Sequence, residues 1–448
     1  MINPTNLISD LISRITEAGQ SLTGFEFGTS VDFTTLCEHL ISEKGEAVGI
    51  AIAREILSRY KAFDKKAKLD FFTTLLHDFS SDKQALDKAF LEWQKNGVAS
   101  ARAIHLASEP KSIEFISRLN RVKGATSEIV EMRNDLLGFL KAHPELKPLD
   151  DDFKHLLTSW FNRGFLELKS IDWTTSAEIL ERIIEYEAVH EIQGWDDLRR
   201  RVGEPDRRLF AYFHPAMANE PLIFVQVALM DKTPVAIHPI LSADRIAIDP
   251  EKATTAAFYS ISNCQPGLRG ISFGNFLIKK AVMELQREIP SIKTLITLSP
   301  IPRLTAWLES EIKKPTGLLG DSQIDFISAL NKTKLLPTDK AGISMIREIA
   351  AIYLVNARSS QGEIYDPVAK FHLGNGAYLK NIHANANLSK TDDGEWKGWG
   401  MMVNYEYKLQ ELEKNHESFI NDHVVIHSSE VQALVKKGNK KQAKELAS

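Results

Sequence analysis

The first part of the chain repeats apolar residues at the spacing of amphipathic helices. Segments such as EAVGIAIAREILSRYKAF and SEIVEMRNDLLGFLKAH place apolar side chains three and four positions apart, which is the period of one helix face. Ser81 and Asp82 precede KQALDKAFLEWQKN and are N-cap candidates. Strand-like runs are scarce here. The pattern predicts an all-α domain over residues 1–165, built of antiparallel helices joined by short loops.

Beyond about residue 166, strand-like runs alternate with helical ones. The β-rich runs are LFAYFHP, PLIFVQVALM, VAIHPIL, AAFYSISN and KTLITL, and the strand-like WGMMVNYEYKL follows later. Helical patterns include NFLIKKAVMELQREI and AGISMIREIAAIYLVNA, and the polar final stretch VKKGNKKQAKELAS is expected to be a solvated helix or a frayed tail. The alternation predicts an α/β domain over residues 166–448. The fold class of the whole chain is therefore predicted as α+β.

Composition and charge exclude several functional classes. The chain has 448 residues, and a net charge of -4 is not the basic excess of a dedicated nucleic-acid binder. The sequence has no apolar run near the ~20 residues that span a bilayer, and its start fits neither a signal nor a transit peptide. Cys37 and Cys264 are too few for a disulfide framework or a zinc cluster. We expect a cytoplasmic protein without a metal site, a nucleic-acid partner or a membrane partner.

A glycine-rich loop, QPGLRGISFG, lies between a predicted strand and a predicted helix. Gly267, Gly270 and Gly274 permit close backbone approach, and the helix beginning at about Asn275 directs free N–H groups into the loop, a geometry that binds phosphates. The loop is neither a P-loop nor a dinucleotide fingerprint, and it could equally serve only helix–strand packing. It also resembles the pyrophosphate-binding loop of the N-acetyltransferase-like (GNAT) fold, except that Ser272 replaces the first family glycine.

One serine, Ser299, occupies a rigid corner in TLSPIPRLTAWL. Pro300 forces the preceding residue into an extended conformation and cannot continue a central strand, so the strand is expected to end near Ser299. Pro302 suits the first turn of a following helix. Open α/β sheets bind ligands beyond their strand ends. Ser299 is therefore a candidate for presenting its hydroxyl group to a bound substrate. The alternative is that Ser299 only caps the helix.

Two further residues are candidates for chemistry. His372 in FHLGNGAYL is the residue type whose ordinary pKa, about 6.5, suits proton delivery. Tyr407 lies in the alternating stretch NYEYKL. Taken alone, each residue is more often structural than catalytic, so local reasoning favours a structural role for both and leaves a chemical one open.

Several segments together resemble the malonyl-CoA decarboxylase family. They are HPAMANEPLIFVQVAL, AAFYSISNCQPGLRGISFGNFLIKKAVMELQREIP, TLITLSPIPRLTAWL, DPVAKFHLGNGAYLKNIHANANLS and GMMVNYEYKL, with EAVHEIQGWDDLRRRVG at the start of the matching region. The resemblance covers about residues 166–411. The Ser-Pro-Ile-Pro and Phe-His-Leu-x-Asn-Gly-Ala segments in this order are specific to that family.

The resemblance implies a helical oligomerisation domain followed by a GNAT-like catalytic domain. It implies a cofactor-free carboxy-lyase that converts malonyl-CoA to acetyl-CoA and CO2, and a homo-oligomer, dimeric or tetrameric. The family's catalytic serine, histidine and tyrosine match Ser299, His372 and Tyr407. Animal members carry an active-site glutamate where this chain has Ser272. The residues matched to coenzyme A binding are Arg269, Gly270, Ile271, Ser272, Phe273, Gly274 and Asn275.

This chemistry needs hydrogen-bond donors for an enolate and a proton for its α-carbon. We expect Ser299 to donate to the malonyl group and the enolate, His372 to deliver the proton, and Tyr407 to orient the acyl group. Two other functions use the same features: an acyl-CoA-dependent acyltransferase, which needs an amine acceptor, and a non-catalytic acyl-CoA sensor, which binds without turnover.

Overall fold

The computed structural model describes residues 32–42, 45–271, 276–391 and 393–445. The chain forms two compact units. The first comprises the described residues up to Leu166, together with His214–Ala218 and the described part of Gln265–Ser272. The second comprises Glu167–Phe213, Asn219–Cys264 and the described residues after Phe273. The predicted fold class, an all-α region followed by an α/β region, is confirmed.

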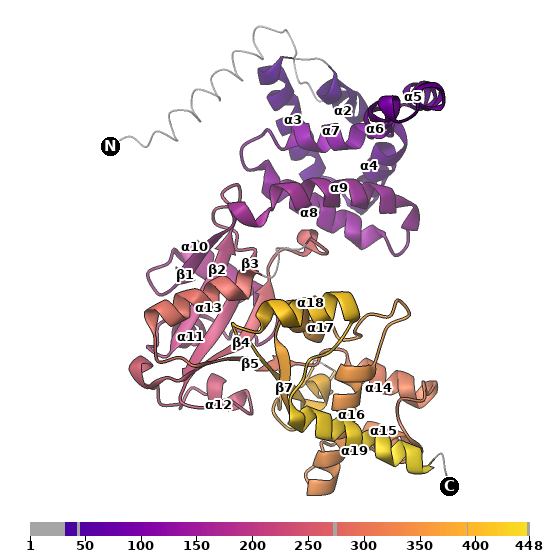
Figure 1. Cartoon of the computed structure of the whole chain (residues 1–448). Coiled ribbons are helices and arrows are strands. Elements are labelled where there is room, and N and C mark those ends of the chain that lie inside the picture. The colour runs from indigo at the N-terminus through magenta and orange to yellow at the C-terminus, as the bar shows by residue number, and fades with distance from the viewer. Residues whose placement is uncertain (1–31, 43–44, 272–275, 392, 446–448) are drawn as a thin grey trace. The chain divides into compact units, whose positions relative to one another are not determined.

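The first unit is built from α-helices joined by short turns (Figure 1). They are α2 (Phe33–Ile41), α3 (Glu46–Lys61), α4 (Lys65–Asp78), α5 (Lys83–Asn96), α6 (Ala101–Ser108), α7 (Lys111–Leu119), α8 (Ala125–Phe139) and α9 (Lys147–Trp160). Aromatic rings fill part of the core, for example Phe71 against Phe115 with ring centroids 6.2 Å apart. Asp82 caps α5 by accepting from the amides of Gln84 and Ala85, as predicted.

The second unit is organised around one mixed sheet (Figure 1). Its strands are β1 (Glu167–Ile171), β2 (Arg207–Phe213), β3 (Ile223–Met230), β4 (Thr255–Asn263), β5 (Thr294–Thr297), β6 (Ser299–Pro300), β7 (Tyr378–His383) and β8 (Met402–Glu406). The order is β1-β2-β3-β4-β5-β8-β6, with β7 paired to β8. β4 and β5 are parallel, and the other pairs are antiparallel. The parallel pair requires a crossover, which α13 (Phe276–Glu288) supplies.

Strand alternation places helices on both faces of this sheet. Phe210 of β2 packs in one cluster with Ile278 and Leu285 of α13. Its neighbours Leu209 and Ala211 pack in another cluster with residues of α10 (Ala177–Tyr186) and α11 (Trp195–Val202). Successive side chains of a strand point to opposite faces, so α13 covers one face of this part of the sheet while α10 and α11 cover the other.

The remaining helices lie mostly in the C-terminal part of the second unit. They are α12 (His238–Leu241), α14 (Leu304–Lys313), α15 (Asp321–Thr333), α16 (Lys340–Asn356), α17 (Pro367–Gly374), α18 (Leu412–Asp422) and α19 (Ser429–Glu445). The end of the chain forms a helix, but one face of it is not solvated, because Val431 and Val435 of α19 are buried in the main core. No helix in the described part of the chain is long and apolar enough to cross a membrane.

One predicted strand is wrong. The run VAIHPIL does not join the sheet, and its second half forms the short helix α12 instead. Pro239 explains the difference, because proline lacks the N–H that a strand ladder requires and suits the first turn of a helix. The apolar residues Ile237 and Ile240 are buried all the same. Their pattern therefore predicted burial correctly and secondary structure incorrectly.

Candidate active site

Ser299 stands where the main sheet is interrupted. β5 ends at Thr297, and after Leu298 the ladder resumes for two residues as β6, which pairs Ser299 with Val403 and Pro300 with Met402 of β8. The predicted end of the strand near Ser299 is confirmed. Pro300 is tolerated because β6 ends the strand order. Ser299 does not cap α14, whose N-cap is Arg303, so the helix-capping alternative is wrong.

His372 is placed by the last turn of α17. The helix starts with Asp366 as its N-cap, which accepts from the amides of Val368 and Ala369, both at 3.0 Å. Pro367 occupies the first turn, where its missing N–H costs no hydrogen bond. The imidazole is buried and stacks on Tyr405 with ring centroids 4.7 Å apart. The ring orientation is therefore held by packing as well as by hydrogen bonds.

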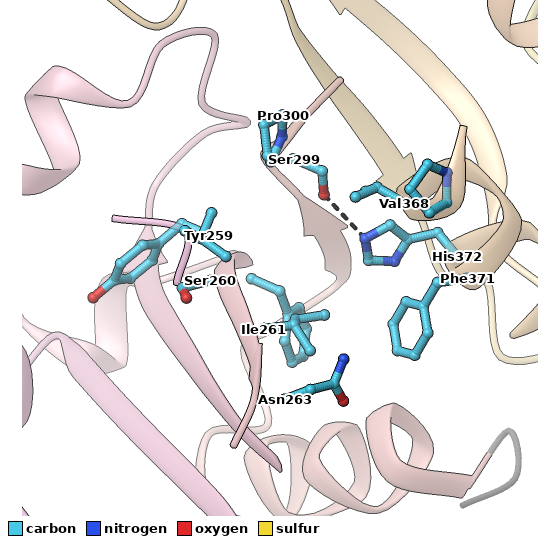
Figure 2. Close-up of a pocket in the computed structure, with 12 residues that line it drawn as sticks. Tyr259, Ser260, Ile261, Asn263, Ser299, Pro300, Val368, Phe371 and His372 are labelled. Atoms are coloured by element: carbon cyan, nitrogen blue, oxygen red, sulfur yellow. Dashed lines mark hydrogen bonds between the residues drawn. The ribbon is translucent and has the colours of Figure 1, made fainter. Parts of the chain in front are cut away.

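Ser299, His372 and Tyr407 form one hydrogen-bonded chain. The Oγ of Ser299 lies 3.0 Å from Nε2 of His372 (Figure 2), and the hydroxyl of Tyr407 lies 2.7 Å from Nδ1 on the other side of the ring. Ser299 also donates to Oγ1 of Thr297 at 2.9 Å. The three residues predicted as catalytic are thus brought together from β6, α17 and the position directly after β8.

The direction of the bond from Ser299 to Thr297 indicates the tautomer of His372. A serine hydroxyl has one hydrogen, and Ser299 donates it to Thr297. Nε2 of His372 is therefore the donor to Ser299, and Nδ1 accepts from the hydroxyl of Tyr407. Burial lowers the pKa of His372 to about 3 and raises that of Tyr407 well above its ordinary value. Both groups are consequently neutral at neutral pH.

Ser299 and His372 open onto a cavity of about 310 Å³, at the lower end of the range for small-molecule sites. Its walls come from β4, β6, α17 and the segment after α10 (Figure 2). The lining residues are Val189, Phe258, Tyr259, Ser260, Ile261, Asn263, Ser299, Pro300, Pro367, Val368, Phe371 and His372. None of these side chains carries a charge at neutral pH. Tyr407 does not line the cavity, because its hydroxyl faces the far side of His372.

Sequence reasoning missed the polar groups that support this cavity. The carboxylate of Glu187, which is buried, accepts from Ser260 at 2.7 Å and from the amides of Val189 and His190 at 2.8 and 2.9 Å. It also accepts from the side chain of Gln226. Glu187 thereby fixes Val189 and Ser260, two of the lining residues. No local motif marks Glu187, whereas the two-residue spacing of Thr297 and Ser299 was a usable signal.

The predicted coenzyme A-binding residues are only partly described. Arg269 and Gly270 are exposed, Ile271 is buried, and all three belong to the first unit. Gly270 has a φ of +78°, a conformation that favours glycine. Ser272, Phe273, Gly274 and Asn275 lie outside the described residues. Among the described residues, no group of three or more His, Cys, Asp or Glu side chains is arranged to hold a metal ion.

A buried, hydrogen-bonded serine–histidine pair at the wall of a small cavity is typical of an enzyme active site. Comparison with known families also indicates an enzyme and identifies the family to which it belongs. The family model for the malonyl-CoA decarboxylase C-terminal domain matches residues 164–445, and the model for the N-terminal domain of that family matches residues 79–161. The chain therefore belongs to the malonyl-CoA decarboxylase family.

Individual relatives agree with this membership. The chain is 35% identical over 354 residues to the mitochondrial malonyl-CoA decarboxylase of Anser anser anser, covering 73% of this chain and 69% of that protein. The crystal structure of malonyl-CoA decarboxylase from Rhodopseudomonas palustris is 43% identical, with a TM-score of 0.84 and coverage of 90% of this chain and 98% of that one. The crystal structure of the enzyme from Agrobacterium vitis gives 44% identity, the same TM-score, and coverage of 90% and 99%.

Proposed function

We propose that the cavity binds the malonyl thioester of malonyl-CoA and that Ser299 and His372 carry out its decarboxylation to acetyl-CoA and CO2. Family membership supports a carboxy-lyase acting on malonyl-CoA. The observation that carries the residue assignment is the 3.0 Å hydrogen bond between Ser299 and a neutral, buried His372 at the wall of the cavity. The modest cavity volume suits a short acyl group.

The first step breaks the bond between the α-carbon and the carboxylate. CO2 leaves, and the electron pair passes into the thioester as an enolate. Ser299 turns its hydroxyl from Thr297 to the thioester oxygen, where charge develops. A donor held in this position is worth about 10²–10³ in rate. The backbone of Ser299 is fixed by pairing with β8, so little reorganisation is needed.

The uncharged lining of the cavity also favours this step. A carboxylate that leaves water without gaining a cation is destabilised. None of the residues that line the described cavity supplies such a cation. As CO2 forms, the charge moves from the carboxylate to the thioester oxygen, where Ser299 donates. The lining therefore destabilises the bound malonyl carboxylate more than the transition state.

The second step adds one proton to the α-carbon. His372 donates from Nε2, which already points toward Ser299 and the cavity. The ring is then left negatively charged, and the hydroxyl of Tyr407, which donates to Nδ1, stabilises that charge. One proton taken up from solvent restores the neutral ring and balances the proton that the α-carbon gained. Tyr407 thus acts as a positioning residue for His372, a role that differs from direct orientation of the acyl group. The Arg269–Asn275 loop binds the phosphates of coenzyme A in this proposal.

The test mixes purified protein with malonyl-CoA alone and follows CO2 and acetyl-CoA together. Equal amounts of both products, with the rate reduced about 10²–10³-fold in Ser299→Ala, are expected. Ser112→Ala is the control, because Ser112 is likewise buried and hydrogen-bonded but lies in the helical unit. Binding of malonyl-CoA without release of CO2, even when an amine is supplied, would leave a sensor as the function. Loss of the acyl group only with an amine would make the protein an acyltransferase.

A further inference from the structure

Arg133 of α8 is among the most deeply buried charged side chains of the first unit, with 1% of its surface exposed. Its Nε donates to Oδ1 of Asp150 on α9 at 2.9 Å, in an ion pair that is itself buried. Its Nη1 donates to the carbonyl oxygens of Gly267 at 2.6 Å and Arg269 at 3.0 Å. The guanidinium therefore ties two helices to the start of the glycine-rich loop.

Burying an arginine is costly unless its charge is paired and its N–H groups are bonded. Here Asp150 supplies the charge, and Lys147 at 2.8 Å shares the same carboxylate. The Nη1 group of Arg133, which takes no part in that ion pair, donates to backbone oxygens of the loop. A planar guanidinium presents several donors in a fixed fork, so it fixes the spacing of the Gly267 and Arg269 carbonyls in a way that a lysine ammonium does not.

Close packing fixes the same segment against α8. A Cβ on Gly267 would lie 1.9 Å from the carbonyl oxygen of Val130, so only glycine permits this approach. Three residues further on, Gly270 is exposed. A Cβ there would lie 3.9 Å from Nζ of Lys154 on α9, whose ammonium makes no ion pair within the described part of the chain. Arg269 is also exposed. The side chains of Arg269 and Lys154 are therefore solvated cations at a loop whose backbone is packed against α8 at Gly267.

We propose that Arg133 is a positioning residue for coenzyme A binding. It holds the Gly267 and Arg269 carbonyls so that the described part of the loop, residues 265–271, and the cations of Arg269 and Lys154 present a ready site for the phosphate groups of coenzyme A. This inference rests on the proposed function, because it assumes that the loop binds those phosphates. It assigns to the helical unit a part in substrate affinity that is separate from the chemistry at Ser299 and His372.

The test compares Arg133→Lys with the wild type on two substrates, malonyl-CoA and malonyl-pantetheine, which lacks the phosphates. For malonyl-CoA, KM is expected to rise about tenfold, as for the loss of a charge-assisted hydrogen bond, with kcat little changed. For malonyl-pantetheine, kcat/KM is expected to equal that of the wild type. Arg118→Lys is the matched control, since Arg118 also donates to two backbone carbonyls of the helical unit, those of Leu40 and Ser42.

An equal loss on both substrates would overturn the proposal, because it would show general damage to the fold, and so would an unchanged KM for malonyl-CoA. If Arg133→Lys does not fold, Gly267→Ala decides in its place, since it moves the same segment away from α8 and leaves Arg133 intact. Its KM is then expected to rise for malonyl-CoA alone. A wild-type protein that decarboxylates neither substrate would contradict the proposed function instead.

Discussion

At the scale of single residues, the site depends on contacts between positions far apart in the sequence. Ser299 and His372 are 73 residues apart, and His372 and Tyr407 are 35 apart. The prolines that follow Ser299 indicated it as a candidate from the local sequence, whereas the family resemblance indicated His372 and Tyr407. Glu187 and Arg133 could not be found this way, because their partners come from other elements and no local pattern distinguishes them from ordinary surface charges.

Tyr407→Phe tests the hydrogen-bonded chain at this scale. The change removes the donor to Nδ1 of His372, so kcat is expected to fall about tenfold, in line with one lost charge-assisted hydrogen bond, while the affinity for acetyl-CoA is kept. Tyr405→Phe is the matched control. Tyr405 stacks its ring on His372, and phenylalanine retains that stacking, so kcat is expected to stay near the wild-type value. Equal kcat for the two variants would contradict the role of Tyr407.

At the scale of elements, the hydrophobic pattern predicted which segments are buried better than it predicted their conformation. The long helices α13 and α16 and the strands β2 to β5 follow from their periodicity. The run that became α12 shows where one proline decides between strand and helix. The two-residue strand β6 was not predictable as a strand, because its pairing with β8 depends on a segment about a hundred residues later in the chain.

The cap of α17 gives a prediction at this scale. Asp366→Ala removes the acceptor for two amides and is expected to cost about 1 kcal/mol or more of stability. It is also expected to lower kcat, because α17 carries His372. Asp339→Ala is the matched control, since Asp339 caps α16 in the same way and α16 lines no part of the cavity.

Thermal unfolding and kcat measured together separate the two effects. Both variants are expected to unfold at a lower temperature, and only Asp366→Ala is expected to lose activity. An Asp366→Ala variant that is destabilised yet fully active would show that α17 does not position His372.

At the scale of the whole molecule, buried neutral histidines make stability depend on pH. Burial lowers the pKa of His372 to about 3, and burial together with the charge of Arg201 lowers that of His190 to about 3. An unfolded histidine takes up its proton near pH 6.5. Between about pH 6.5 and pH 3 the unfolded chain therefore binds more protons than the folded one, and the free energy of unfolding falls as pH falls.

The expected slope is up to about 1.4 kcal/mol per pH unit for each such histidine. His372→Asn is expected to lose less stability than the wild type between pH 6.5 and pH 4.5, as measured by denaturant unfolding at several pH values. His77→Asn, a change at an exposed histidine of the helical unit, is the control and is expected to keep the wild-type slope. The same slope in all three proteins would contradict a neutral, buried His372.

The division into two units carries a separate expectation, that the helical unit mediates a homo-oligomer. This stays a prediction from the family resemblance. The proposal that Arg133 positions the loop assigns the helical unit a second role, in substrate affinity, and this role is to be measured separately from assembly.

The most direct test of the proposed mechanism compares the formation of acetyl-CoA from malonyl-CoA by the wild type and by His372→Asn in a single turnover. His427→Asn, at a half-buried histidine outside the cavity, is the control. A loss of about 10²–10⁴ in the rate of acetyl-CoA formation is expected for His372→Asn, the range for a lost general acid, with the affinity for acetyl-CoA retained. Formation of acetyl-CoA at the wild-type rate by His372→Asn would contradict the assignment of His372 as the proton donor.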